Sequence, residues 1–371
     1  MLHQTWIQNL VEQYAVLKNL LHSQEGFHIL FINGHFAGHS PLSLPKGVIL
    51  SHLSSVMKEH PELLQKHLAK ISANVGPNSE DGVFVLIPED TPIEKPIFLD
   101  FVSIPNSQAL DIRSQNLIFM SPYAQSSIIE NYSSLAPGTY STNTTTKIVL
   151  AEGANLDHYQ IQQEGGLAEH RNEISIQQNQ DSQFRSHVFA LGSGLVCNNL
   201  QTTLAAPGAS CILNGLFLGE QKQRMDFHTT IDHAQPNCTS EELYKGILGG
   251  QAQGTFKGRI IVRPHAQKTC ARQTNKNLLL SEEALINTEP ILEIFANDVK
   301  CNHGATIGRL DEAQLFYLTS RGIHRKLAQQ ILIHAFASDL LATIPLNSVR
   351  HHIQTIISEH LAKWSLCAEA A

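Results

Sequence analysis

Between residues 82 and 309 the chain is a succession of short strand-forming stretches, and this feature most limits the folds open to it. Stretches such as GVFVLIP, SSIIENY, TKIVL and GRIIV are separated by segments that contain Gly, Pro, Asn and Ser. No helical periodicity longer than two turns interrupts them. The middle of the chain is therefore predicted to be all-β.

Four turn-like stretches in this region align on one alanine. They are SPYAQS, AEGANL, APGASC and RPHAQK, with Ala124, Ala154, Ala209 and Ala266 at the shared position. Their spacings of 30, 55 and 57 residues are too irregular for propeller blades, but they fit a coil of roughly twenty to thirty residues with insertions. Polar runs such as SIQQNQDSQ favour stacking of like residues along a solenoid face. The pattern favours a parallel β-helix, with a β-sandwich as the alternative.

The segment before this region mixes helix and hairpin signals. Apolar residues recur at helical spacing over 7–17 and again over 63–71. Between these segments, FINGHF places Asn33-Gly34 between two apolar runs, which is a strong hairpin signal. Residues 1–78 are predicted to form an α+β cap, followed by the β-helix core over 79–309.

Helical periodicity returns after Gly308. Asp311 is a suitable N-cap and Gly322 a suitable stop for a first helix. A second helix is expected to end before Pro345, and a third follows it. Residues 310–371 are therefore predicted to be a C-terminal helical segment, which either caps the end of the solenoid or offers a docking surface.

The composition excludes several classes of function. The chain has 371 residues, with 42% hydrophobic and 16% charged residues, as expected of a globular protein. The net charge of -7 and the lack of a basic run argue against nucleic acid as a partner. The N-terminus lacks a signal-peptide pattern and no apolar run is long enough to span a bilayer, so we expect a cytoplasmic protein without a membrane partner. The six cysteines are widely spaced, and free thiols are expected.

Several catalytic and binding motifs are absent from the sequence. It contains no P-loop, and LGSGLV lacks the third glycine of a dinucleotide fingerprint, so we expect this chain to bind no nucleotide. It also contains no G-x-S-x-G, no H-E-x-x-H and no C-x-x-C. A self-contained catalytic or cluster site is not predicted.

One group of candidate ligands lies in RMDFHTTIDHAQPNC. Asp226, His228, Asp232, His233 and Cys238 fall within thirteen residues. Imidazole and thiolate are common ligands of zinc and iron. The stretch is either part of a metal site or a polar connection between two strands.

A second candidate lies in DVKCNHGATIG. If this stretch is a strand, Cys301 and His303 project from the same face, because side chains alternate with period two. Both side chains could then reach one ion. The same alternation is also expected of a buried solenoid wall, since free cysteine is among the most buried residue types.

Longer stretches carry a family resemblance. PILEIFANDVKCNHGATIGRLDEAQLFYLTSRGI (290–323), the segment 226–262, AQKTCARQTNKNLLLS and FINGHF together resemble the SufB/SufD family of iron–sulfur cluster assembly proteins. The C-x-H-G-A-T-[IV]-G form is similar to the SufD branch of that family. Cys270 departs from the family pattern, which usually has an acidic residue at this position.

The resemblance implies a fold, partners and a site. The fold would be a right-handed parallel β-helix flanked by helical regions, in a heterodimer with SufB and with SufC ATPase subunits on the C-terminal helices. The chain would be a non-catalytic scaffold subunit that contributes to iron acquisition, and a nascent, transient Fe–S cluster would form at the SufB interface. His303 would be its ligand, with Cys301 beside it. The stretch 224–238 supplies the weaker metal candidates His228, His233 and Cys238. The alternatives are a β-helix polysaccharide lyase or esterase, and a purely structural partner of SufB.

Overall fold

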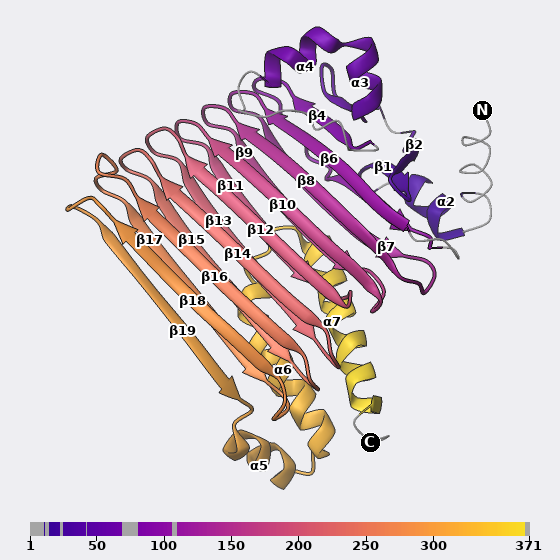
Figure 1. Cartoon of the computed structure of the whole chain (residues 1–371), viewed down its shortest axis with the longest axis vertical. Helices are drawn as coiled ribbons and strands as arrows, with labels where there is room; N and C mark the ends of the chain where they lie inside the picture. Colours follow the sequence, from indigo (N-terminus) through magenta and orange to yellow (C-terminus); the bar gives the residue numbers. More distant parts are fainter. Residues whose placement is uncertain are drawn as a thin grey trace.

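A computed structural model describes residues 11, 15–22, 25–41, 43–68, 81–105 and 110–367. Two long sheets face each other along the chain, and successive strands alternate between them (Figure 1). From β4 onward, each strand pairs in parallel with the strand two places further along the chain. The predicted parallel β-helix is confirmed. A sandwich of antiparallel sheets is excluded, because parallel pairs predominate in both sheets.

The sheets hold ten and nine strands within these residues, and we call them sheet A and sheet B. Sheet A contains β1 (Phe27–Ile32), β2 (His35–His39), β5 (Ile97–Ser103), β7 (Gln125–Ser134), β9 (Asn155–Gln163), β11 (Gln183–Ala190), β13 (Ser210–Gly219), β15 (Thr239–Leu248), β17 (Cys270–Leu279) and β19 (Lys300–Arg309). Sheet B contains β3 (Ile49–His52), β4 (Val83–Ile87), β6 (Leu110–Met120), β8 (Tyr140–Leu150), β10 (Ala168–Gln178), β12 (Leu195–Leu204), β14 (Arg224–His233), β16 (Gln253–Val262) and β18 (Leu285–Ile294).

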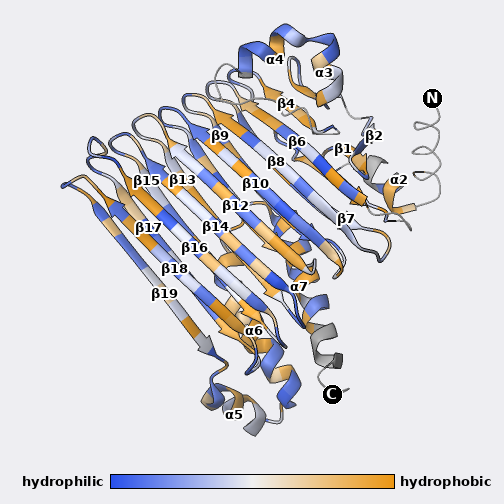
Figure 2. Ribbon diagram, viewed as in Figure 1, coloured by the Kyte–Doolittle hydropathy of each residue, from blue (hydrophilic) through white to orange (hydrophobic). Residues whose placement is uncertain are grey.

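The interior between the sheets is filled by one side chain in two from each strand. This alternation is visible as bands of opposite hydropathy along the strands (Figure 2). The four aligned alanines lie at the turns that lead into sheet A strands, and all four are buried in the interior. A small side chain suits this position because the turn brings the backbone close to the core. The predicted repeat is therefore confirmed.

The N-terminal hairpin is also present. Asn33 and Gly34 both have positive φ, of 50° and 82°, and connect β1 to β2. β1 then pairs in parallel with β5, which makes the hairpin the first part of sheet A. Two short helices, α3 (Leu53–Glu59) and α4 (Pro61–Leu68), pack on sheet B through Leu53, Val56 and Leu64.

The predicted N-terminal helices are described only in part. The helix expected over 7–17 lies largely outside the described residues, which include α2 (Ala15–His22). The helix expected over 63–71 corresponds to α4 as far as it is described.

The three C-terminal helices are α5 (Glu312–Ser320), α6 (Arg325–Leu341) and α7 (Asn347–Cys367). Helices α6 and α7 lie along the outer face of sheet A rather than across an end of the solenoid (Figure 1). Ile333, Leu340 and Ile353 pack there against apolar residues of sheet A, such as Tyr159. The C-terminal segment is therefore part of a second apolar core.

Polar contacts fix the position of α6. The Lys245 ammonium, on β15, donates hydrogen bonds to the Phe336 carbonyl and the Asp339 carboxylate and lies 4.6 Å from the centre of the Phe336 ring. Further along, Thr343 lies 3.1 Å from Nε2 of His187 and accepts a hydrogen bond from Asn214. These contacts fix both the register and the depth of the helix on the sheet.

Candidate functional site

The end of the solenoid formed by β18 and β19 is open. β19 is the last strand of sheet A and β18 the last of sheet B, so each has one edge without a neighbouring strand among the described residues. Nearly every side chain of β19 is exposed, in contrast to the alternating burial of β17. Leu285, Phe295 and Ile307 are apolar and at least half exposed at this end. Exposed edge strands with apolar side chains are surfaces that other chains pair with.

Cys301 and His303 both lie on this last strand. They follow the period-two alternation, in register with the inward-facing Ala271 and Gln273 of β17. Cys301 is half-buried and packs against the solenoid core, and burial raises the pKa of its thiol. His303 is exposed, because no further coil covers it. The two side chains therefore share a face but differ in access to solvent.

These two residues fit part of a metal site. An imidazole and a thiol are donors that iron accepts, and Gly304 has open space where a side chain would stand. In the described part of the chain, however, no group of three or more His, Cys, Asp or Glu side chains is placed to hold a metal ion. This end of the chain can therefore supply one or two ligands, and the remaining ligands must come from another molecule.

The histidine and cysteine cluster of residues 224–238 is dispersed by the strand it lies on. His228 is exposed on the outer face of sheet B, whereas His233 is buried in the interior and lies 2.9 Å from the Ser240 hydroxyl. Burial lowers the pKa of His233 to about 4, so its imidazole is neutral near pH 7. Cys238 is buried at the turn after β14, with its thiol toward the Ala206 carbonyl. Asp232 pairs with Arg263. These residues do not converge on one point.

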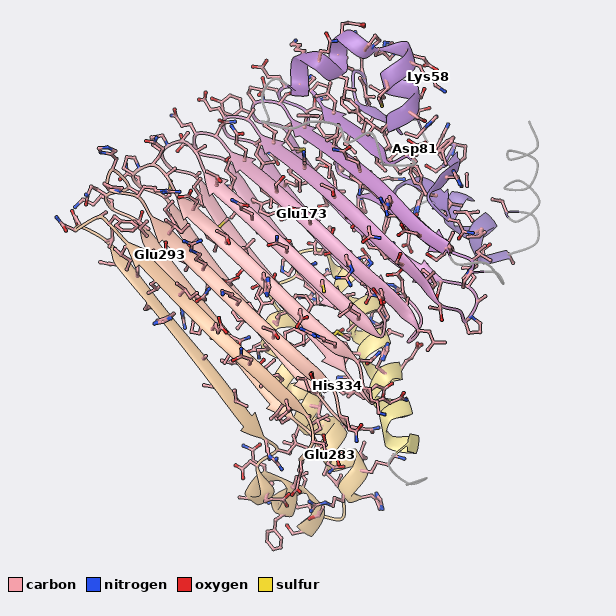
Figure 3. All side chains as sticks on the ribbon, in the orientation of Figure 1. Lys58, Asp81, Glu173, Glu283, Glu293 and His334 are labelled. Carbon is pink, nitrogen blue, oxygen red and sulfur yellow. The ribbon has the colours of Figure 1, made fainter. Side chains whose placement is uncertain are left out.

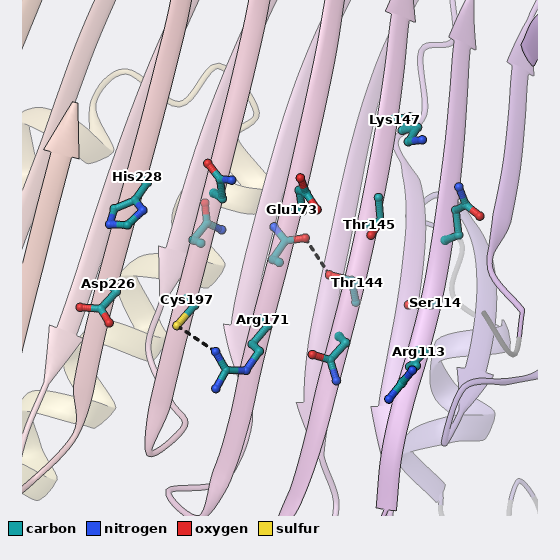
Figure 4. Close-up of a pocket in the computed structure, with 15 residues that line it drawn as sticks. Arg113, Ser114, Thr144, Thr145, Lys147, Arg171, Glu173, Cys197, Asp226 and His228 are labelled. Atoms are coloured by element: carbon teal, nitrogen blue, oxygen red, sulfur yellow. Dashed lines mark hydrogen bonds between the residues drawn. The ribbon is translucent and has the colours of Figure 1, made fainter. Parts of the chain in front are cut away.

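The outer face of sheet B carries a long polar groove of about 610 Å³. Arg171 points toward the Cys197 sulfur at 3.6 Å, with His228 and Asp226 further along the groove (Figure 4). Acidic side chains also project from this face, such as Glu173 and Glu293 (Figure 3). Arg259 forms a bidentate pair with Glu293. The groove is mixed in charge, and Cys197 is the register partner of Asp226 within it. Burial raises the pKa of the Cys197 thiol, which disfavours the reactive thiolate.

A second exposed apolar surface lies on α5 and the start of α6. Phe316 is 74% exposed, and Tyr317 and Leu327 are more than half exposed. The surface is thus distinct from the buried face that α6 presents to sheet A. Its aromatic side chains are of the kind enriched in protein interfaces.

Charged groups inside the solenoid are functional candidates that the sequence motifs do not single out. Glu130 is fully buried, where it accepts hydrogen bonds from Tyr132 and Thr146 and lies 3.3 Å from His158. Although burial opposes ionisation, these partners hold the pKa of Glu130 below its usual range. A second buried carboxylate, Glu164, lies 2.7 Å from His170. Glu130 lies two residues from the buried Ile128 on the same strand. Since side chains alternate along a strand, this spacing predicts that Glu130 also faces the interior.

The fold and the candidate site together define a β-helix with one open end, where Cys301 and His303 lie. The family described as "SUF system FeS cluster assembly, SufBD core domain" matches residues 104–336, and "SufBD protein N-terminal region" matches residues 7–99. The chain belongs to the SufBD family of iron–sulfur cluster assembly proteins, and it is SufD-like.

Individual relatives agree with this assignment. An iron–sulfur cluster assembly SufBD family protein of Synechocystis is 31% identical over 347 residues, which cover 89% of this chain and 77% of the relative. Iron–sulfur cluster assembly protein SufD of Escherichia coli is 34% identical over 238 residues, or 64% of this chain and 56% of the relative. SufD of Bacillus subtilis is 25% identical over 323 residues, or 84% and 74%. No helix in the described ranges combines the length and apolar character needed to cross a bilayer.

Proposed function

We propose that this chain is the SufD-type subunit of a SufB–SufC–SufD complex and supplies part of the site where a nascent Fe–S cluster is assembled. The observation that carries the proposal is the open end of the β-helix, where an exposed imidazole lies on an edge strand that pairs on one side only. The residues that the structure describes offer too few convergent ligands for a cluster. A site shared with a second subunit accounts for both features.

The open end is the surface we assign to SufB. β18 and β19 present free strand edges together with Leu285, Phe295 and Ile307. A second β-helix of the same family can continue both sheets there by strand pairing. Burial of these apolar side chains would then close the last coil and place His303 between the two subunits.

The exposed surface of α5 and α6 is the one we assign to SufC, which would supply ATP hydrolysis to a scaffold that is itself non-catalytic. Phe316→Asp is expected to abolish co-purification of SufC and to leave SufB pairing intact, since Phe316 lies on the helices rather than on β19. Glu283→Asp serves as the control, because Glu283 is exposed in the turn before β18 and not on these helices. Retention of SufC by a folded Phe316→Asp complex would contradict this assignment.

Iron, or the cluster, is the cargo of this complex rather than its resident cofactor. His303 would be the main ligand, because its ring is exposed and a neutral imidazole binds iron. Cys301 would be an auxiliary thiol, since it is half-buried and its raised pKa disfavours the thiolate. The five described cysteines are free, as expected in the reducing cytoplasm where we place the complex.

Anaerobic loading of the purified SufB–SufC–SufD complex with iron and sulfide tests the site. His303→Ala is expected to reduce cluster formation severely, and Cys301→Ala to reduce it much less, with both partners retained in each variant. The absorption spectrum of the complex and its iron content are the measurements. Normal loading of the His303→Ala complex would show that the chain is only a structural partner of SufB. Turnover of a polysaccharide by the isolated chain would instead support a lyase or esterase.

A further inference from the structure

Three inward-facing positions form one row across the last strands of sheet A. Glu242 on β15 is in register with Gln273 on β17, and Gln273 is in register with His303 on β19. Neighbouring strands are about 4.8 Å apart, so side chains along one row are within reach of each other. Glu242 and Gln273 are buried, whereas His303 is exposed. The row therefore leads from the interior to the imidazole at the open end.

The amide of Gln273 has a defined orientation. Its Nε2 donates a hydrogen bond of 2.6 Å to Oε2 of Glu242. Its carbonyl oxygen, Oε1, is buried but accepts no hydrogen bond from any described residue. Buried carbonyl oxygens are strongly favoured to have a donor. The Gln273 carbonyl thus has an unused capacity for one.

A glycine on the facing strand leaves the room that the Gln273 amide occupies. Opposite Gln273, on β16, a Cβ built on Gly258 would lie 2.0 Å from the Gln273 Nε2 atom. Glycine at 258 is therefore what allows the amide to lie where it does. His303 is the register neighbour on the open side, and its ring has no hydrogen bond or ion pair within the described residues. A ring N–H of His303 would be the donor available from this row.

Histidines that bind metals generally donate their second ring nitrogen to a carbonyl or carboxylate, which fixes the tautomer and the ring orientation. We propose that Gln273 is a positioning residue for His303: its side-chain carbonyl accepts a hydrogen bond from one ring nitrogen and leaves the other free to bind the cargo at the open end. This inference rests on the proposed role of His303. Glu242 extends the arrangement by holding the Gln273 amide in place.

The first test observes the His303 ring in the isolated chain, without iron or partners. With ¹⁵N-labelled histidine at pH 8, where imidazole is neutral, the His303 signals are identified by their loss in His303→Asn. In the wild type, one tautomer should give two well-separated ring nitrogen resonances. In Gln273→Met these resonances should converge toward an averaged position. Identical His303 signals in the wild type and Gln273→Met would overturn the proposal.

Two further variants keep the test decisive if Gln273→Met folds poorly. Gly258→Ala displaces the amide without changing either partner, and it should also average the His303 tautomers. The double variant Glu242→Gln, Gln273→Glu swaps the two side chains. It preserves an amide–carboxyl hydrogen bond and keeps an acceptor beside His303, so the His303 ring should again adopt a single tautomer. Gln160→Met is the matched control: Gln160 is an equally buried glutamine on the same inner face, and its carbonyl accepts from Asn198 instead.

The second test measures Fe²⁺ affinity of the complete complex by competition with a chelator. Loss of such a supporting hydrogen bond typically weakens metal binding by about 10–100-fold, and we expect this loss in Gln273→Met but not in Gln160→Met. If His303→Ala leaves the affinity unchanged, the proposed role of His303 fails. If His303→Ala weakens binding but Gln273→Met does not, only the positioning role of Gln273 fails.

Discussion

Glu242 is a fully buried carboxyl group whose ionisation opposes folding, and its replacement by glutamine should show this directly. Burial raises the pKa of Glu242 from 4.5 to about 7, although a hydrogen bond from Gln273 favours the ionised form. Between these two pH values the folded chain binds more protons than the unfolded chain. The contribution of Glu242 to the free energy of unfolding must therefore fall as the pH rises from about 4.5 to 7, and then level off.

The size of this effect follows from the shift. The difference between these two pKa values corresponds to about 3 kcal/mol, since each pKa unit is worth about 1.4 kcal/mol. Glu242→Gln retains the shape of the side chain and an acceptor for Gln273 Nε2, but it carries no charge at any pH. We expect the variant to be more stable than the wild type by about 3 kcal/mol at pH 8 and by less than about 1 kcal/mol at pH 5.

Urea unfolding followed by circular dichroism at pH 5 and pH 8 measures the two stabilities, and the difference between variant and wild type cancels the titration of all other groups. Glu130→Gln is the control of opposite sign. Its hydrogen-bond partners hold the pKa of Glu130 below its usual range, so its charge stabilises the fold at neutral pH and Glu130→Gln should be destabilising at pH 8. A stability difference for Glu242→Gln that does not change with pH would refute the reasoning.

Two further outcomes concern the C-terminal helices. Burial lowers the pKa of His187 to about 4, so the contribution of His187 to stability, up to about 3 kcal/mol, should be lost as the pH falls from about 6.5 to 4. Because His187 contacts Thr343, just after α6, hydrogen exchange corrected for intrinsic rates should show α6 opening first at pH 5. Uniform exchange along the chain would contradict this. Deletion of 310–371 should yield a β-helix that aggregates, since the deletion uncovers the apolar side chains of Tyr159 and Phe189. If light scattering shows that the truncated chain is monomeric, α6 and α7 are dispensable for covering this face.

The sequence itself determined the β-helix and its turns, because these depend on local patterns. Period-two alternation, turn residues and the repeated alanines are read within one coil, and each coil repeats the same local geometry. The Asn33-Gly34 hairpin was predictable for the same reason, since its positive φ values need only the two residues at the turn. Alternation also predicted that Cys301 and His303 share a face.

Only the tertiary structure decided which of these residues meet. His228 and His233 are separated by an odd number of positions on one strand, so they face opposite sides of sheet B despite their proximity in sequence. The row of Glu242, Gln273 and His303 depends on strand register over about sixty residues, which is set by the lengths of intervening turns. The amphipathic pattern of α6 does not specify the sheet face that buries it, since any apolar surface of that width would satisfy it.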